Sequence, residues 1–250
     1  MMELNCSSLP NKKAIHDFID CLKNIFYPGF FKCDVNIKEE EDKARELFNQ
    51  YICDDKENTE FFFNSIPVLK EKYLKDLKFT YECDPACDSY EEIISCYPGF
   101  TATFYYRIAN LLYALGIRIT ARFISEQAHF LTGIDINPGA QISSPLFIDH
   151  GTGIVIGETA IIGHHVKIYQ GVTLGALALS KGHQLTGTKR HPTIGNYVTI
   201  YSGASILGGD VKIGDNVVIG SNVFLMKSIP SNTKVVIPEP KLTIITKEKK

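Results

Sequence analysis

An aliphatic residue recurs at almost every sixth position through the second half of the chain. The series is Ile136, Ile142, Ile148, Ile156, Ile162, Ile168, Leu174, Ile194, Ile200, Ile206, Ile213, Ile219 and Leu225. This period fits neither the turn of an α-helix, at about 3.6 residues, nor the two-residue alternation of a strand. It is typical of a parallel β-helix, in which three short faces form one triangular coil and the aliphatic side chains stack inside. We therefore predict a left-handed parallel β-helix of roughly five coils over residues 134–233.

The first half of the chain follows helical spacing instead. Expected helices run from a cap at Asn11 to Pro28, over 38–52, over 59–79 with an interruption near Pro67, over 90–96, and over 101–132 with a bend near Gly116. An all-α domain is thus expected over 1–133, followed by the β-helix and by a C-terminal tail over 234–250. The fold class is predicted to be α+β.

The six-residue period is interrupted at three places. A two-residue slip separates Ile148 from Ile156, a long excursion covers 175–193, and a one-residue slip falls at 208–210. The excursion is polar and contains glycine. A loop of that length on so regular a scaffold is usually functional or disordered.

Charge is distributed unevenly along the chain. Residues 1–99 carry 12 Lys and Arg against 20 Asp and Glu, whereas residues 100–250 carry 14 against 8. The basic repeat part suits an anionic ligand, although scattered surface lysines would give the same count.

The seven cysteines all precede the repeat and include no CxxC pair. This usage favours reduced thiols and makes a zinc site unlikely on sequence grounds. There is no apolar run long enough for a membrane-spanning helix, and the first residues lack the apolar segment of a secretory signal. We therefore expect a cytoplasmic protein.

Two of the seven histidines lie at the interruptions. His150 follows Asp149 in the first slip, and His191 follows Arg190 at the end of the excursion. Asp135 begins the first coil, about one coil before His150, and stacked coils lie ~4.8 Å apart. We expect the Asp135 carboxylate to orient the His150 imidazole, which would make a general-base pair. Because no cysteine follows Cys96, acyl transfer directly to an activated hydroxyl or amine is the simplest scheme.

Six segments together resemble one enzyme family. They are DPACDSY (84–90), GIDINPGAQI (133–142), IDHGTGIVIGETAIIG (148–163), QGVTLG (170–175), KRHPTIG (189–195) and YSGASILGG (201–209). The combination resembles serine O-acetyltransferase, the first enzyme of cysteine synthesis from serine. The resemblance covers about residues 80 to 230.

The resemblance implies a role for each matching residue. His150 would be the general base for the serine hydroxyl, and Asp135 would orient it. Asp84, with its neighbour Pro85, and Asp149 would bind the serine ammonium. Arg190 and His191 would bind the serine carboxylate and help to balance its charge. Two N–H groups of a guanidinium can donate to the two oxygens of a carboxylate at once.

The resemblance also implies acetyl-CoA as the co-substrate, bound along the β-helix between neighbouring chains of a trimer, and no metal. The matching corner positions are Gly175, Ser202, Gly203 and Ser221. Lys181, Lys189 and Lys212 are candidates for phosphate contacts on charge alone. A homotrimer or a dimer of trimers is expected, with cysteine as a possible feedback inhibitor. Because a C-terminal isoleucine is absent, a tight complex with O-acetylserine sulfhydrylase is not expected.

Three other interpretations remain open at this stage. One is a hexapeptide acetyltransferase that acts on another small hydroxyl acceptor, such as a sugar. Another is a metal hydratase that binds zinc through His150, His164 and His165, although we expect the adjacent pair to point to opposite faces. The third is a non-catalytic assembly platform, which would leave Asp135, His150, Arg190 and His191 without a role. No nucleic-acid or membrane partner is expected.

Overall fold

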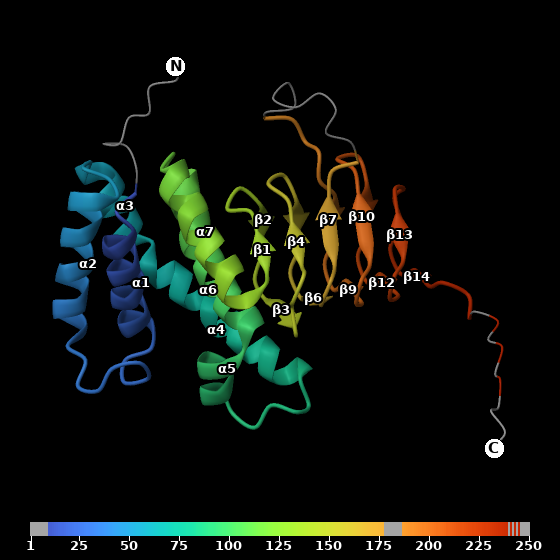
Figure 1. Ribbon diagram of the computed structural model, residues 1–250, viewed down its shortest axis with the longest axis horizontal. Coiled ribbons are helices and arrows are strands. Elements are labelled where there is room, and N and C mark those ends of the chain that lie inside the picture. The colour runs from blue at the N-terminus through green and yellow to red at the C-terminus, as the bar shows by residue number, and fades with distance from the viewer. Residues whose placement is uncertain (1–9, 178–186, 240, 242, 244, 246–250) are drawn as a thin grey trace.

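The computed structural model describes residues 10–177, 187–239, 241, 243 and 245. A helical half lies at one end of the molecule, and a β-helix extends from it toward the C-terminus (Figure 1). The two halves have separate hydrophobic cores, one among the helices and one inside the coils. This arrangement confirms the predicted fold class.

The helices match the sequence prediction closely. They are α1 (Lys12–Phe26), α2 (Ile37–Tyr51), α3 (Lys56–Asn64), α4 (Ile66–Cys83), α5 (Tyr90–Cys96), α6 (Pro98–Ala114) and α7 (Arg118–Thr132). The Asn11 side chain caps α1 by accepting a hydrogen bond from the Ala14 N–H at 3.1 Å. Pro67 stands in the first turn of α4, and Gly116 takes a φ of +80° between α6 and α7. None of the described helices is long and apolar enough to cross a membrane.

Short parallel strands build the coils. They are β1 (Asp135–Ile136), β2 (Gln141–Ile142), β3 (Leu146–Asp149), β4 (Val155–Ile156), β5 (Ile161–Ile162), β6 (Val166–Tyr169), β7 (Thr173–Gly175), β8 (Thr193–Ile194), β9 (Thr199–Ile200), β10 (Ser205–Leu207), β11 (Lys212–Ile213), β12 (Val218–Ile219), β13 (Phe224–Leu225) and β14 (Lys234–Val235). Three sheets form the faces of the triangle, in the orders β1-β4-β7-β10-β13, β11-β8-β5-β2 and β14-β12-β9-β6-β3. Each strand therefore pairs with the strand one coil away.

The aliphatic residues of the six-residue period stack inside the triangle. Ile156 lies opposite both Ile136 and Leu174 in neighbouring coils, and all three are buried. Corners require left-handed backbone, which glycine and asparagine adopt most readily. His165 and Tyr197 nevertheless adopt φ of +56° at one corner, so bulky side chains also occupy these turns.

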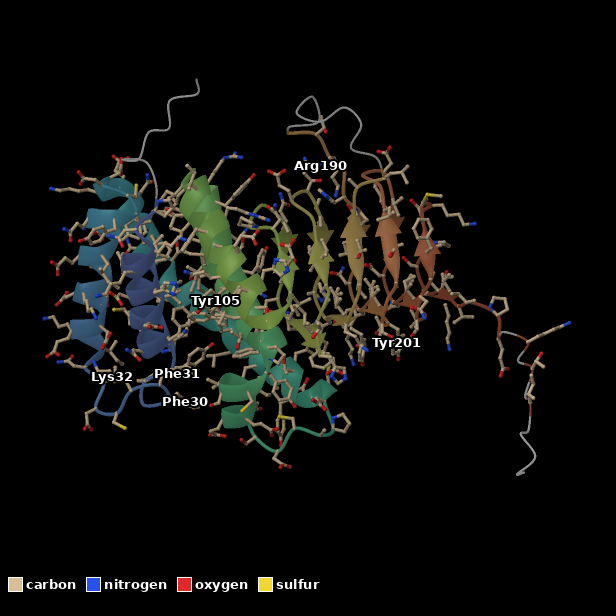
Figure 2. The ribbon with its side chains drawn as sticks, in the orientation of Figure 1. Phe30, Phe31, Lys32, Tyr105, Arg190 and Tyr201 are labelled. Atoms are coloured by element: carbon tan, nitrogen blue, oxygen red, sulfur yellow. The ribbon has the colours of Figure 1, made fainter. Side chains whose placement is uncertain are left out.

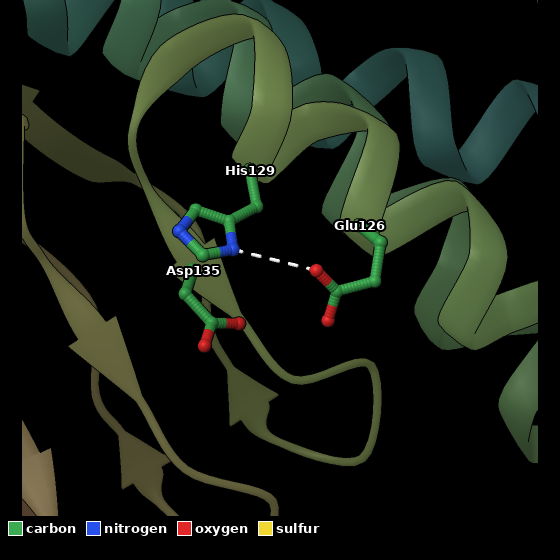
Figure 3. Close-up of side chains that lie close together, drawn as sticks. All are labelled: Glu126, His129 and Asp135. Atoms are coloured by element: carbon green, nitrogen blue, oxygen red, sulfur yellow. Dashed lines mark hydrogen bonds and ion pairs between the residues drawn. The ribbon is translucent and has the colours of Figure 1, made fainter.

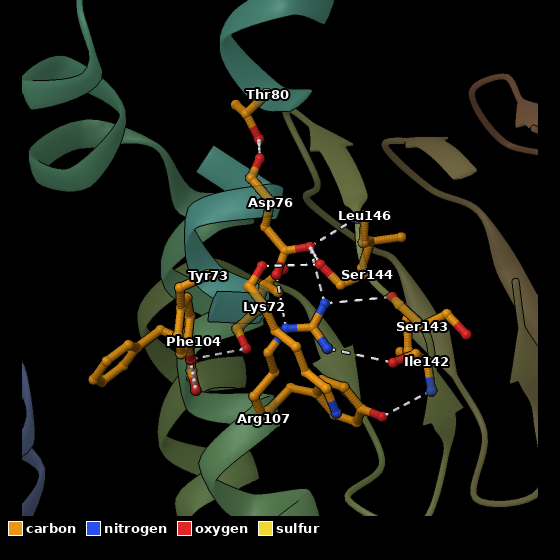
Figure 4. A network of polar contacts seen from close by, with 12 residues as sticks. Lys72, Tyr73, Asp76, Thr80, Phe104, Arg107, Ile142, Ser143, Ser144 and Leu146 are labelled. Carbon is orange, nitrogen blue, oxygen red and sulfur yellow. Dashed lines mark hydrogen bonds and ion pairs between the residues drawn. The ribbon is translucent and has the colours of Figure 1, made fainter. Parts of the chain in front are cut away.

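A buried ion pair joins the helical half to the first coil. The Arg107 guanidinium of α6 binds the Asp76 carboxylate of α4 through two hydrogen bonds of 2.7 and 2.9 Å. Asp76 also accepts hydrogen bonds from the Ser144 hydroxyl and the Leu146 N–H, both at 2.9 Å (Figure 4). Arg107 donates in addition to the carbonyl of Ile142 at 3.3 Å. The pair thus fixes the orientation of the helices relative to the β-helix.

Candidate active site

Two aspartates from different halves of the chain approach the same tyrosine. Asp84 caps the end of α4, where its Oδ2 accepts a hydrogen bond of 2.6 Å from the Tyr97 hydroxyl, and Pro85 follows it in an exposed turn. Asp149 ends β3 directly opposite Tyr169 of β6. Burial raises the pKa of Tyr169, and the negative charges of Asp149 and Asp84 raise it further. The two predicted ammonium ligands therefore share one neighbourhood.

His150 lies immediately beyond Asp149 and points outward. Its backbone is left-handed, with φ of +57°, and its side chain is 70% exposed. Its Nε2 atom lies 3.7 Å from Asp149 Oδ1. The strand register places Gln170 at the matching corner of the next coil, where its Oε1 atom is buried without a partner among the described residues. We expected neither Gln170 nor Tyr169 in this site.

A second group of predicted residues lines a separate groove. Asp135, Gly175, Arg190 and His191 surround a volume of about 330 Å³ along the sheet that contains β1, β4 and β7. Figure 2 shows Arg190 at the upper edge of the β-helix and Tyr201, which stacks on Tyr169 at 5.1 Å, at the lower edge. The ammonium ligands and the groove thus lie at opposite edges of one chain.

The structure does not bring Asp135 to His150 within one chain. Asp135 lies opposite Val155, which is several positions beyond His150, so coil stacking places the two residues at different points of the corner. The neighbours of the Asp135 carboxylate are instead Arg122, at 3.9 Å, and the side chains of Glu126 and His129 (Figure 3). Within one chain Asp135 and His150 therefore make no contact.

Arg190 belongs to a polar chain that the sequence did not reveal. Its Nη2 atom donates to Glu158 Oε2, and Glu158 Oε1 accepts a hydrogen bond of 2.6 Å from the Tyr113 hydroxyl. The hydrogen bond from Tyr113, followed by that from Arg190, lowers the pKa of Glu158. Glu158 thus holds the guanidinium at the wall of the groove.

His191 is nearly buried and contacts Thr159. The Thr159 N–H donates to His191 Nδ1 at 3.1 Å, and the Thr159 hydroxyl lies 2.9 Å from the same atom. Burial, followed by the positive charges of Arg190 and Lys189, lowers the pKa of His191 to about 4. The imidazole is therefore neutral near pH 7, so it cannot contribute a positive charge to the site.

Lys189 has an internal role. Its Nζ atom donates to the carbonyls of Thr159, His191 and Pro192 at 2.6, 2.5 and 3.2 Å. Three carbonyl partners satisfy all three donors of the ammonium group. Lys189 therefore ties the end of the excursion to the coil, and the phosphate contact expected from its charge has no donor left to use. Lys181 lies outside the described residues, and Lys212 is exposed on β11.

The expected CoA positions divide between the two edges. Gly175 lines the groove, whereas Ser202, Gly203 and Ser221 follow the corner that carries His150. The Ser202 and Ser221 hydroxyls lie 3.2 Å apart. At Gly203 φ is +71°, and a Cβ atom would displace the Asn222 side chain of the next coil, so glycine is favoured there.

The expected separation of His164 and His165 is wrong. Their Nδ1 atoms lie 2.8 Å apart, because the left-handed backbone of His165 breaks the alternation of side chains. His165 also stacks on Tyr197 at 4.7 Å. His150 does not join this pair. In the described part of the chain, the group with three candidate metal ligands is Glu126, His129 and Asp135, where Arg122 already supplies a cation.

The six-residue repeat forms a parallel β-helix, and the candidate site residues lie where the repeat is interrupted. These features define a hexapeptide-repeat parallel β-helix protein. Serine acetyltransferases are similar to this chain in sequence. The protein from Staphylococcus epidermidis is 49% identical over 161 residues, which cover 64% of this chain and 72% of that protein. A plasmid-encoded one from Synechococcus elongatus is 48% identical over 155 residues, or 61% of this chain and 49% of that protein. The chain thus spans about half the length of that cyanobacterial relative. No family model matches the chain.

Solved structures agree with this similarity. Serine acetyltransferase 1 of Entamoeba histolytica, in complex with L-cysteine, superposes with a TM-score of 0.82 at 39% identity, covering 88% of this chain and 86% of that one. The Neisseria gonorrhoeae enzyme in complex with serine gives 0.67 at 32% identity, covering 88% and 82%. A serine acetyltransferase complex with CoA gives 0.63 at 27% identity, covering 88% and 80%. The chain belongs to the serine acetyltransferase family.

Proposed function

We propose that this protein is a serine O-acetyltransferase, which transfers the acetyl group of acetyl-CoA to the hydroxyl of L-serine and releases O-acetyl-L-serine and CoA. The observation that carries this proposal is the position of Asp149, which lies opposite Tyr169 and whose Oδ1 is 3.7 Å from Nε2 of the exposed His150, with Asp84 near enough for its charge to raise the pKa of Tyr169. Paired carboxylates suit an ammonium group, and an outward imidazole suits a hydroxyl. Membership of the family supports the same activity. The reduced cysteines support a cytoplasmic location.

In the proposed reaction His150 acts as the general base. Its imidazole removes the proton from the serine hydroxyl while the oxygen attacks the thioester carbonyl of acetyl-CoA. The tetrahedral intermediate then expels the CoA thiolate, which takes the proton back from the imidazolium. Asp135 is proposed to hold the imidazole in the tautomer that accepts the proton, as a carboxylate does for other catalytic histidines.

The remaining predicted residues bind the two substrates. Asp84 and Asp149 are proposed to hold the serine ammonium, and Arg190 the serine carboxylate, because opposite charges at the two ends of the zwitterion select an α-amino acid. CoA is proposed to lie along the groove at Gly175, and a relative solved in complex with CoA supports CoA as a ligand. Cysteine has the same ammonium and carboxylate as serine, so we propose that it competes for this site, in line with relatives solved with cysteine.

The site is proposed to form between two chains. Asp135 and Arg190 line one groove, whereas His150 and Asp149 lie outside it, so we propose that a neighbouring chain supplies the missing half. Phe130 and Leu131 at the end of α7 are 90% and 60% exposed, which supports a contact with another chain there. A trimer, or a dimer of trimers joined through the helical half, satisfies both requirements.

The activity is tested by thiol release from acetyl-CoA, measured with and without L-serine. We expect release to depend on serine, and His150→Ala to lower kcat by about 10²–10⁴ because general-base catalysis is lost. His16→Ala is the matched control, since His16 is an exposed histidine on α1 that contacts Gln127, at 2.8 Å, and the ring of Phe123. Unchanged turnover in His150→Ala would refute the role of this residue. Release with a sugar acceptor but not with serine would refute the substrate.

A further inference from the structure

Thr159 determines which nitrogen of His191 carries the proton. The Thr159 backbone N–H lies 3.1 Å from His191 Nδ1, and a backbone N–H can only donate. The Thr159 hydroxyl oxygen accepts hydrogen bonds from the backbone N–H groups of Arg190 and His191 at 2.9 and 3.0 Å. Both of its lone pairs are then used, and its own proton is left to point at His191 Nδ1, 2.9 Å away. Two donors at Nδ1 require that this atom carries a lone pair.

The single proton of the neutral ring must therefore reside on Nε2. Two cations, Lys189 and Arg190, flank the ring, and Glu158 is the one anion that partly offsets them. Burial and these cations lower the pKa of His191 to about 4, so the ring carries no second proton near pH 7. His191 is thus an uncharged hydrogen-bond donor. Its Nδ1 lone pair is occupied by Thr159, so the ring cannot act as a base.

The ring of His191 lies against Gly157 in the wall of the groove. A Cβ atom on Gly157 would overlap Cδ2 and Nε2 of the ring, so this position leaves room for the ring only as glycine. His191 as a residue is 8% exposed, and its Nε2 has no hydrogen-bond partner among the described residues. A nearly buried donor without a partner, beside Arg190, is suited to an anionic oxygen.

We propose that Thr159 is a positioning residue that locks His191 as a neutral imidazole with its proton on Nε2, the nitrogen left to donate to the substrate carboxylate that the family resemblance assigns to His191 and Arg190. The identity of the ligand rests on the proposed function. The state of the ring does not, because it follows from contacts within this chain alone.

The state of the ring is tested by ¹⁵N NMR of the full-length protein labelled at histidine. We expect His191 near pH 7 to show an unprotonated Nδ1 and a protonated Nε2, and Thr159→Ser to preserve this pattern. Thr159→Val, which has the same shape without the hydroxyl, keeps the backbone N–H but removes the second donor at Nδ1, so it should raise the fraction of His191 that is protonated at Nδ1. A protonated Nδ1 or a charged ring in the unsubstituted protein would overturn the proposal even if the enzyme is active on serine.

Two matched substitutions at His191 test the donor. The amide of His191→Gln reaches the position of Nε2 and can donate there, whereas His191→Asn keeps an acceptor for Thr159 but places no donor at that position. We expect the KM for serine to rise about tenfold more in the Asn variant than in the Gln variant, with kcat changed similarly in both. Equal KM values, or a lower value for the Asn variant, would contradict the proposed donor.

Thr159 itself is tested by the same kinetic separation. Thr159→Val should raise the KM for serine by about tenfold or more, and Thr159→Ser should restore it, since serine keeps both the hydroxyl and the backbone N–H. A merely structural role for Thr159 would change kcat and KM together and leave the His191 tautomer unaltered. That result would overturn the proposal.

Discussion

The function of a single side chain in this protein depends more on its local contacts than on its residue type. Lys189 has the charge expected of a phosphate ligand, but its ammonium group donates hydrogen bonds to three backbone carbonyls. His191 has the side chain of a base but is held as a neutral donor by burial and nearby cations. The His150 side chain is 70% exposed because its left-handed backbone directs it away from the coil. The same residue type therefore has different functions at two interruptions of one repeat.

The neutral His191 predicts a pH dependence of stability. Its pKa is about 4 in the folded chain and near the ordinary value of 6.5 when unfolded. As the pH falls from 6.5 to 4, the unfolded chain gains a proton that the folded chain does not, so the free energy of unfolding decreases. His191→Gln lacks this titration and should lose less stability over that range. Urea denaturation of both proteins at several pH values measures the difference, and parallel curves throughout would contradict the prediction.

Elements are held together by polar contacts that cross between the two halves. Helices α4 and α6 contribute Asp76 and Arg107, whose side chains are almost fully buried at the first coil. The Asp76 carboxylate accepts hydrogen bonds from the Ser144 hydroxyl and the Leu146 N–H as well as from the Arg107 guanidinium, so both charged groups have partners (Figure 4). Because Asp84 caps the same helix, the pair also sets where that carboxylate lies relative to His150.

Removing one partner of this buried pair should be costly. Asp76→Ala leaves the Arg107 charge buried without a carboxylate, and we expect the free energy of unfolding to fall by about 3–5 kcal/mol. Glu71→Ala is the matched control on the same helix. Glu71 pairs with Lys75 at 2.7 Å on the exposed face, so its substitution should leave the denaturation midpoint almost unchanged. Equal midpoints for the two variants would show that the junction does not depend on Asp76.

The whole molecule is an open scaffold whose coils run straight from the helical half, so the chain does not fold back on itself (Figure 1). In the assembly that we propose, association of identical chains would supply the missing half of each site at once, because a cyclic trimer repeats the same contact three times. The proposed activity therefore depends on assembly as well as on residues.

This dependence predicts rescue between inactive variants. In oligomers formed by co-expressing His150→Ala with Arg190→Ala, about a quarter of randomly assembled interfaces contain both native halves, so about a quarter of the native activity should return. A mixture of Asp149→Ala with His150→Ala should remain inactive. Both substitutions fall in the half of the site that contains His150, so no interface in the mixture has this half intact. If the first mixture is inactive although it assembles to the native mass, the site lies within one chain.

Local features of this fold were predictable from sequence because they depend on periodicity. Inward positions of the coil follow from the six-residue spacing, and helix ends follow from Asn11, Pro67 and Gly116. Glu158 and Thr159 were missed because outward corner residues carry no periodic signal. Their partners, Arg190 and His191, return 32 residues later after the excursion.

By itself, the sequence determined the β-helix, the helical half and the candidate residues at the interruptions, since each of these depends on spacing along the chain. Only the tertiary structure decided which side chains meet. Coil register places Asp135 opposite Val155, and left-handed turns bring His164 to His165 and turn His150 outward. The burial of His191 beside two cations decides its protonation. These outcomes depend on contacts between coils and on the local electrostatic environment, which no linear pattern of residue types encodes.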